Sequence, residues 1–599
     1  MSGEQGGNEP GPLPSGVANG DRLISLGEAV ERGTNGGTNG AASGAANGGK
    51  HRKPRSRRYK WVRRSLIAVG LVIVLIIAGV VADYYYLGSL VTKKVVPHLQ
   101  TTVGATENIL LIGSTNRCAL KVQNPAYGLC SQGVTGINSD IDMVIHLDPA
   151  TGAVSLLSIP RDLFVPNARI TGANKIDAAL VEGPGQLVAA IEEDFAIPIN
   201  HYVELNFDTF ASVVNALGGI KMYFPVPIFD AESGLNVQYP GCRPLDGYHA
   251  LQVVRARHLQ IQPSPSNHDH ATWPQEALSD LARIRRTHEF LRVLAAKVAA
   301  RGLGDPIVDQ SLATAVLPDL TVDSGFSEGE MVSLARTFAH TKIAHVPQVT
   351  YPVLEVETNS YLYQGYYYGD VEFPVQPTGR STVNQIFGVK AGTSSFTGKP
   401  LPAPASFRVS VVDGAAAPSQ AALVARQLTA KGFHVVSNGT TTPVGPVSET
   451  VVWYGGPRPP AHGNWTSPAL EAAQAVFSEL QGPVSLGYDP TMVTPGALVT
   501  VQTGTDVSVK TSAVPAKTAT TTTTKSKATT TTTKTKTKTK TKTAATTTTL
   551  YDPPGVRTNN SFGAPSPTNP ALEPWDPRAC NAAGTGPAGG PAKKSTKKK

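Results

Sequence analysis

An uncharged apolar segment near the start of the chain is the strongest constraint on its architecture. Residues 66–82 (LIAVGLVIVLIIAGVVA) contain no charged side chain, and three tyrosines follow at 84–86. A helix needs roughly 20 predominantly apolar residues to cross a bilayer core. A cleaved signal peptide would place a shorter apolar region nearer the start, ahead of a small-residue cleavage site. We therefore expect residues 62–87 to form a retained transmembrane helix.

The charge on either side of this segment predicts its orientation. Residues 51–64 (HRKPRSRRYKWVRR) are dense in Arg and Lys, whereas the following flank has only Lys93 and Lys94. Positively charged flanks stay on the cytoplasmic side of a membrane. We expect a single-pass protein of the cell membrane, with a cytoplasmic N-terminus and extracytoplasmic domains after the helix.

Both ends of the chain have the composition of solvated segments. Residues 1–60 are rich in Gly, Asn, Ala and Ser, and residues 510–599 combine a Thr/Lys tract with a Pro/Gly-rich end. Such segments cannot bury a core, so we expect a disordered basic cytoplasmic head and a disordered tail. Residues 1–64 hold 11 Lys and Arg against 5 acids, and residues 507–599 hold 16 against 3. The net charge of +9 therefore comes from the ends, and it does not indicate a nucleic-acid partner.

The region between the ends predicts two α/β domains. In residues 101–390, apolar runs alternate with amphipathic helical patterns, which is typical of a sheet flanked by helices. A smaller α/β domain is expected over residues 405–509. The expected strands are 108–113, 141–147, 153–159, 406–414, 433–438 and 449–456, and the expected helices are 186–195, 207–217, 277–300, 419–433 and 468–482.

The four cysteines indicate disulfides rather than a metal ribbon. No two of them form a CxxC pair, which a zinc ribbon would need. An exported location permits disulfides. A Cys118–Cys130 bond would close a short loop, but three connectivities with Cys242 and Cys580 remain open.

Arginines next to apolar strands and helices are the candidate chemistry. The sequence has no GxSxG, HExxH or Walker motif. Converging arginines with paired carboxylates suit a diphosphate and a hard cation, although surface ion pairs have the same spacings. Asp140 and Asp142 lie two apart on a strand, so we expect them on one face. The other candidates are Arg161 after a strand, Arg255 and Arg257 in an R-x-R motif, and Asp280, Arg283 and Arg286 at helical spacing.

The order of motifs across about residues 107–300 resembles the LytR-CpsA-Psr family. The matching segments are NILLIGS, SDIDMVIHLDP, LLSIPRD, KIDAAL, YVELNFDTFASVVNALGGI, GCRPLDGYHALQVVRARH and DLARIRRTHEFL. SVVDG, with the helix and GFHVV after it, resembles the LytR C-terminal domain. The resemblance implies a central sheet flanked by helices with a lipid groove. It also implies transfer of a glycopolymer from a polyprenyl-diphosphate carrier to peptidoglycan, with Mg²⁺.

The resemblance also implies roles for individual residues. Asp140 matches a magnesium ligand. Asp280 and Arg286, which frame the last arginine motif, and Arg117 are substrate-binding candidates. Asp162, like Asp140, is a candidate general base. The diphosphate-binding arginines are expected to be Arg161, Arg255, Arg257 and Arg283.

Two departures from the family pattern leave alternatives open. Thr115 replaces an acid, and Asn138 and Ile141 stand where the family commonly has Arg and Thr. We hypothesise that Asp142 supplies the missing charge at the metal. The alternatives to a phosphotransferase are a non-catalytic wall-binding scaffold and a polyprenyl-diphosphate hydrolase. Relatives attach teichoic acids, capsular polysaccharides or arabinogalactan. The composition and the second domain resemble actinobacterial members of the family, and this resemblance favours arabinogalactan.

Overall fold

The computed structural model describes two α/β domains and a short C-terminal segment. The described residues are 86–101, 106–120, 123, 128–301, 310, 313–338, 341, 346–355, 361–415, 417–440, 448–458, 465, 467–510 and 565–588. The predicted head and nearly all of the predicted transmembrane helix at 62–87 lie outside them. Among the residues that are described, no helix has both the length and the apolar character needed to cross a membrane.

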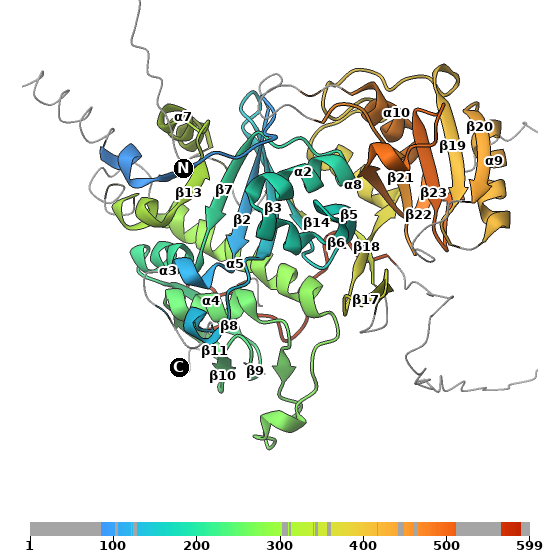
Figure 1. Cartoon of the computed structure of the whole chain (residues 1–599). Coiled ribbons are helices and arrows are strands. Elements are labelled where there is room, and N and C mark those ends of the chain that lie inside the picture. The colour runs from blue at the N-terminus through green and yellow to red at the C-terminus, as the bar shows by residue number, and fades with distance from the viewer. Residues whose placement is uncertain are drawn as a thin grey trace, which may run out of the picture. The chain divides into compact units, whose positions relative to one another are not determined.

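A seven-stranded mixed sheet forms the centre of the larger domain (Figure 1). β3 lies between β2 and β4 and pairs antiparallel with each of them, and β7 runs parallel to β2. These three consecutive strands confirm the strands expected at 108–113, 141–147 and 153–159. In spatial order the sheet contains β1 (Thr92–Lys94), β13 (Thr321–Asp323), β7 (His201–Leu205), β2 (Glu107–Ser114), β3 (Ser139–Asp148), β4 (Ala153–Ile159) and β14 (Gln348–Thr350).

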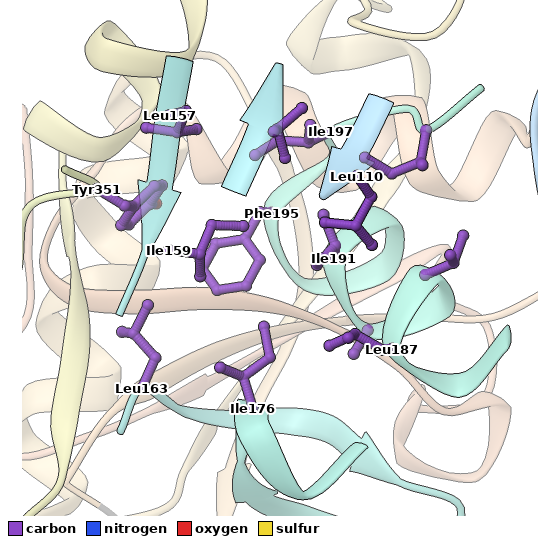
Figure 2. Close-up of a cluster of buried hydrophobic side chains, with 14 of the residues drawn as sticks. Leu110, Leu157, Ile159, Leu163, Ile176, Leu187, Ile191, Phe195, Ile197 and Tyr351 are labelled. Carbon is purple, nitrogen blue, oxygen red and sulfur yellow. The ribbon is translucent and has the colours of Figure 1, made fainter. Parts of the chain in front are cut away.

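One face of this sheet packs against helix α2 (Pro184–Phe195). Leu110 of β2 is fully buried and packs in one cluster with Leu187, Ile191 and Phe195 of the helix (Figure 2). Ile112 of β2 is also fully buried and belongs to this cluster. Because side chains alternate along a strand, the intervening Leu111 points to the other face. β2 is therefore a central strand that is buried on both sides, which explains its nearly continuous apolar sequence.

The opposite face of the sheet carries the helices that build the candidate site. They are α3 (Phe207–Ala216), α4 (Gly247–Arg255) and α5 (Ser279–Arg301). α3 and α5 confirm the helices expected at 207–217 and 277–300. α7 (Glu328–Phe338) covers the end of the sheet near β1. Shorter strands complete this domain: β5 (Phe164–Arg169), β6 (Gly172–Lys175), β8 (Ile220–Phe224), β9 (Ile228–Asp230), β10 (Leu235–Val237), β11 (Gly241–Leu245) and β12 (Gln260–Ile261).

The smaller domain has its own α/β core and shares a sheet with the larger one. α9 (Pro418–Ala430) and α10 (Pro468–Phe477) confirm the expected helices, and Gly432 follows α9 with a φ of 90°. β15 (Val353–Glu355) and β18 (Glu372–Gln376) come from the region predicted as the first domain, yet β18 pairs with β22. The other strands of this sheet are β19 (Arg408–Asp413), β20 (His434–Thr440), β21 (Thr450–Tyr454), β22 (Leu480–Tyr488), β23 (Val499–Thr503) and β24 (Ser508–Val509).

Residues 565–588 contradict the expectation that 510–599 is entirely a disordered tail. This segment returns to the larger domain, where β25 (Arg578–Ala579) pairs antiparallel with β8. A disulfide joins Cys242 to Cys580, and a second joins Cys118 to Cys130. The sequence did not indicate this return because the segment contributes few apolar residues, and its contacts are a short strand pairing, a buried acid, a tryptophan and a disulfide.

Candidate functional site

The candidate site lies where β2 and β4 end and the antiparallel β3 begins. Asp140 is the second residue of β3, and Arg161 follows the last residue of β4 by two positions. Because neighbouring antiparallel strands place opposite ends together, these segments meet at one edge of the sheet. α4 and α5 bring their arginines to the same edge.

Arg161 is the centre of an ion-pair network. Its guanidinium pairs with Asp140, lies 2.7 Å from Asp177 Oδ2 and lies 3.9 Å from Asp162 Oδ1. Burial disfavours the charged guanidinium, but these aspartates outweigh that effect and raise the pKa of Arg161. Burial also raises the pKa of Asp177 to about 6, against the opposing influence of Arg161. Arg161 therefore stays charged at any physiological pH.

The R-x-R and D-x-x-R motifs join the same network. Arg257 Nη2 lies 2.9 Å from Asp162 Oδ2, and its Nε lies 3.5 Å from Asp280 Oδ1. Arg283 donates to both oxygens of Asp280 at 2.8 and 3.1 Å, and it donates to the carbonyl of Asp140. Asp280 is buried, yet Arg283 and Arg257 hold its pKa below the ordinary value. The structure thus brings together residues that lie up to 143 positions apart in the sequence.

An apolar cavity opens beside this network. Asp140, Arg255 and Arg283 are the charged residues that line it. The free volume is about 70 Å³, well below the roughly 300 Å³ of a small ligand pocket, so a long apolar ligand would have to part its walls. The apolar lining comes from β2, β3, α3, α4 and α5 through Leu111, Met143, Phe207, Phe210, Leu251, Val254, Phe290 and Leu291.

Phe207 lines the cavity, and its ring makes cation–π contacts with Arg255 and Arg117. The guanidinium carbons of Arg255 and Arg117 lie 4.7 and 5.9 Å from the centre of its ring. The capping box between Asn206 and Thr209 fixes the start of α3 and thereby the position of Phe207. Burial, and then the neighbouring Arg255, lower the pKa of Arg117. Arg117 and Arg255 are therefore two like charges that an anion at the cavity mouth would stabilise.

The expectation that Asp140 and Asp142 share a strand face is wrong. The register pairs Ser114 with Ser139 and Gly113 with Ile141, so Asp140 occupies a β-bulge that breaks the alternation. Asp142 is 2% exposed and accepts a hydrogen bond from Ser139 at 3.0 Å. Burial raises its pKa to about 8, which leaves it mostly protonated at neutral pH. Its predicted role as a metal ligand therefore does not fit this geometry.

Arg286 lies outside the network, although it was expected to bind substrate. Its side chain is fully buried, pairs with Glu276 and donates to the carbonyl of Ala256 at 2.7 Å. Ala256 is the residue between Arg255 and Arg257. Arg286 is thus placed to hold the backbone of the R-x-R motif rather than to touch a substrate.

Three residues of the site were missed at the level of sequence. Asp177 and Lys175 belong to the KIDAAL motif, whose recurrence in the family pattern was the available signal. Lys175 Nζ lies 2.7 Å from Asp162 Oδ1, so it fixes that carboxylate together with Arg257. Phe207 gave no separate signal, because an aromatic residue at the start of an amphipathic helix is normally part of a core.

The donor set can accept one hard cation through Asp140. The carboxylate of Asp140 is 21% exposed at the cavity rim, and Mg²⁺ is commonly held by one or two carboxylates together with substrate phosphates. Thr115, which replaces the family acid, is buried, and its hydroxyl accepts a hydrogen bond from the Asn138 amide. The Asp140 carboxylate is therefore the group at this edge whose chemistry and exposure fit a hard cation.

Comparison with known proteins shows which families the two domains are similar to. Residues 89–372 match the LytR_cpsA_psr family, and residues 406–506 match the family described as LytR cell envelope-related transcriptional attenuator. The probable cell wall biosynthesis protein LcpB of Corynebacterium glutamicum is 35% identical over 240 residues, which are 40% of this chain and 52% of that protein.

Two further proteins carry more specific names. TagV of Bacillus subtilis, named a polyisoprenyl-teichoic acid–peptidoglycan teichoic acid transferase, is 36% identical over 20% of this chain and 32% of its own length. The LytR-Csp2A-Psr enzyme from Actinomyces oris is 21% identical, covers 49% of this chain and 95% of its own, and gives a TM-score of 0.39. The chain thus spans about half, or less, of these two curated relatives, LcpB and TagV. Residues 89–372 therefore form a domain of the LytR-CpsA-Psr family, and residues 406–506 form a LytR C-terminal domain.

Proposed function

We propose that this protein transfers a glycopolymer from a polyprenyl-diphosphate carrier to peptidoglycan and releases polyprenyl phosphate. The observation that carries the proposal is an arginine network at the mouth of an apolar cavity. A charged head and an apolar tail on one donor molecule match these two adjoining surfaces. The names of the relatives, which include cell wall biosynthesis and teichoic acid transfer, support the same class of reaction.

The charge of the network suits a diphosphate diester. Arg117, Arg161, Arg255, Arg257, Arg283 and Lys175 provide six cations, and Asp140, Asp162, Asp177 and Asp280 provide four carboxylates. These named cations outnumber the named carboxylates, which suits an anionic donor such as a diphosphate that is esterified at both ends. Guanidinium groups also match phosphate oxygens through paired, parallel hydrogen bonds.

The proposed reaction is a displacement at the phosphorus that bears the glycan. A hydroxyl oxygen of peptidoglycan forms the new P–O bond, and the bond from this phosphorus to the bridging oxygen breaks, so that polyprenyl phosphate leaves. Arg161 and Arg283 are positioned to stabilise the charge that develops on the phosphate oxygens. Mg²⁺ at Asp140 would supply Lewis-acid polarisation of the same oxygens.

The two candidate bases are both engaged by cations in this state. Asp162 pairs with Lys175 and Arg257, and Asp140 pairs with Arg161. Of the two, only Asp140 lines the cavity. When the donor phosphate pairs with Arg161, Asp140 is released from that ion pair and is the better placed to accept the proton of the acceptor hydroxyl. We therefore assign Asp162 to positioning of the arginines, and Asp140 to the cation and the acceptor hydroxyl.

Replacement of Arg161 tests the proposal. We expect Arg161→Ala in the full-length protein to lower transfer by on the order of 10²–10³-fold, as removal of one preorganised donor does elsewhere. Arg169→Ala is a matched control, because Arg169 pairs with Glu182 outside the network. The assay follows release of polyprenyl phosphate from a glycan-linked polyprenyl diphosphate in the presence of peptidoglycan and Mg²⁺. Equal rates for Arg161→Ala and the control would remove Arg161 from the mechanism.

The same assay separates the alternative functions. Release that depends on peptidoglycan supports transfer, and release of equal rate without an acceptor supports a hydrolase. An absence of release in the wild-type protein supports a non-catalytic scaffold. The polymer itself is best identified by the wall composition of a depletion strain, in which we expect loss of a peptidoglycan-linked polymer, with arabinogalactan proposed first.

A further inference from the structure

A second cluster of ligating side chains lies at the opposite end of the central sheet. It consists of Glu107 at the start of β2, His201 at the start of β7 and Glu330 in α7. One ligand atom from each of the three lies within 4.8 Å of the other two. β2 ends at the arginine network, seven residues or about 24 Å from Glu107, so the cluster is separate from the transfer site.

His201 is held in one orientation by its surroundings. Its side chain is 9% exposed, and its ring stacks on Phe326 with the centroids 4.1 Å apart. Nδ1 lies 3.1 Å from Asp323 Oδ2, and the same oxygen accepts from the amide of Tyr202 at 3.0 Å. An ionised Asp323 therefore keeps the proton on Nδ1 and leaves Nε2 as the ring atom that faces the cluster.

Nε2 then faces groups that are themselves acceptors. The nearest oxygen of Glu330 is 3.6 Å away, and Glu107 has an enclosed Oε2 without a hydrogen-bond partner. The lone pair on His201 Nε2 and the carboxylate oxygens of Glu107 and Glu330 are all acceptors, so burying them together is unfavourable unless a cation lies between them. That cation is either a proton on Nε2 or a metal ion.

We propose that Glu107, His201 and Glu330 bind a divalent transition-metal ion, with Zn²⁺ and Mn²⁺ as the best-suited ions. One imidazole nitrogen and two carboxylates are the donors that these ions accept. Asp323 on Nδ1 is the partner that a metal-binding histidine normally has. Bond lengths of about 2.1 Å would bring the ligand atoms to about 3.4 Å from one another, a closure that rotation of the two Glu side chains can provide.

The site would act as a clamp on the fold. It joins the starts of two central strands to α7, and Asp323 belongs to β13, which pairs with both β1 and β7. β1 is the strand closest in sequence to the predicted transmembrane helix. Metal binding would therefore stabilise the edge of the sheet nearest the N-terminal segment, and it does not require the transfer reaction.

Metal binding by the full-length chain tests this proposal directly. After treatment with a chelator, the protein is titrated with Zn²⁺ alone, and bound metal is counted after gel filtration. We expect one equivalent in the wild type, and about tenfold or greater weakening in Glu330→Gln and Glu107→Gln. Glu330 is one-third exposed, so its replacement leaves the core intact. Asp323→Asn should weaken binding by about 10–100-fold by acting through His201.

Two controls and a spectroscopic signature complete the experiment. Glu328 lies on the same helix as Glu330 but pairs with Lys93, so Glu328→Gln is the first control. Asp140→Asn, which removes the proposed magnesium ligand, is the second control. Both variants should bind Zn²⁺ as tightly as the wild type. Co²⁺ as a probe should give d–d absorption bands that Glu330→Gln reduces. Failure of the wild type to bind stoichiometrically, or equal binding by Glu330→Gln, would overturn the proposal and leave His201 as a protonated partner of three acids.

Discussion

At the scale of single residues, burial decides which charged groups can act on a substrate. Arg161 and Asp140 keep 15% and 21% of their side-chain surface accessible, whereas Asp142 and Arg286 are enclosed. All four fit the sequence pattern equally well, because a motif records residue type and spacing but not exposure. The same consideration applies to His288, which no motif distinguishes and which is one of the most perturbed groups of the domain.

Because His288 is buried as a neutral imidazole, we expect the free energy of unfolding to fall in mild acid. Burial, and then Arg292, lower its pKa from 6.5 to about 4, and its Nε2 is 2.8 Å from Ser158 Oγ. The unfolded chain therefore binds more protons than the folded chain between these pH values. His288 should cost about 2 kcal/mol of stability between pH 7.5 and pH 5. Denaturant unfolding at both pH values should show a smaller acid loss in His288→Gln than in the wild type; an equal loss would contradict the assignment.

At the scale of elements, regular periodicity was predictable from sequence and irregular pairing was not. β2, β3, β4, α2, α3 and α5 appear where apolar runs or helical spacing indicated them. The bulge at Asp140 was not predictable, since it depends on how β2 and β3 align across a long connection. The pairing of β18 with β22 likewise joins segments about 100 residues apart, and nothing local to either strand encodes it.

Asn167 on β5 forms two hydrogen bonds to the smaller domain, and we expect them to contribute to the free energy of unfolding of the whole chain. Its side-chain amide donates to the carbonyl of Tyr488 at 2.8 Å and accepts from the amide of Tyr488 at 2.8 Å. Asn167→Ala would leave both backbone groups unsatisfied and should cost about 2–4 kcal/mol. Asn174→Ala on β6 is the control, with an expected cost below about 1 kcal/mol, because its side chain bonds only the adjacent amide. Thermal unfolding of the full chain measures both, and equal costs would show that this contact does not join the domains.

At the scale of the whole molecule, the C-terminal segment (residues 565–588) contacts the buried residues that hold the R-x-R motif in place. Asp576 is fully buried, with Oδ2 2.6 Å from Arg285 Nε and Oδ1 3.6 Å from Arg286. Trp575 Nε1 donates to Glu276 at 3.0 Å, and Glu276 pairs with both arginines. A chain of contacts therefore runs from the last described segment, through Arg286, to the backbone between Arg255 and Arg257.

Asp576→Asn should consequently impair transfer although it lies in none of the site motifs. One buried acid would then face two buried guanidinium groups, and breaking such a pair costs about 3–5 kcal/mol. The Ala256 carbonyl would lose its fixed donor, so Arg255 and Arg257 would be held less rigidly. We expect weaker binding of the polyprenyl diphosphate, measured as a rise in KM together with a fall in kcat. Glu573→Gln in the same segment is the control, because the contact of residue 573 with Asp576 is made by its backbone amide. A variant that loses stability but keeps wild-type kinetics at a temperature where it is folded would confine Asp576 to holding the fold together.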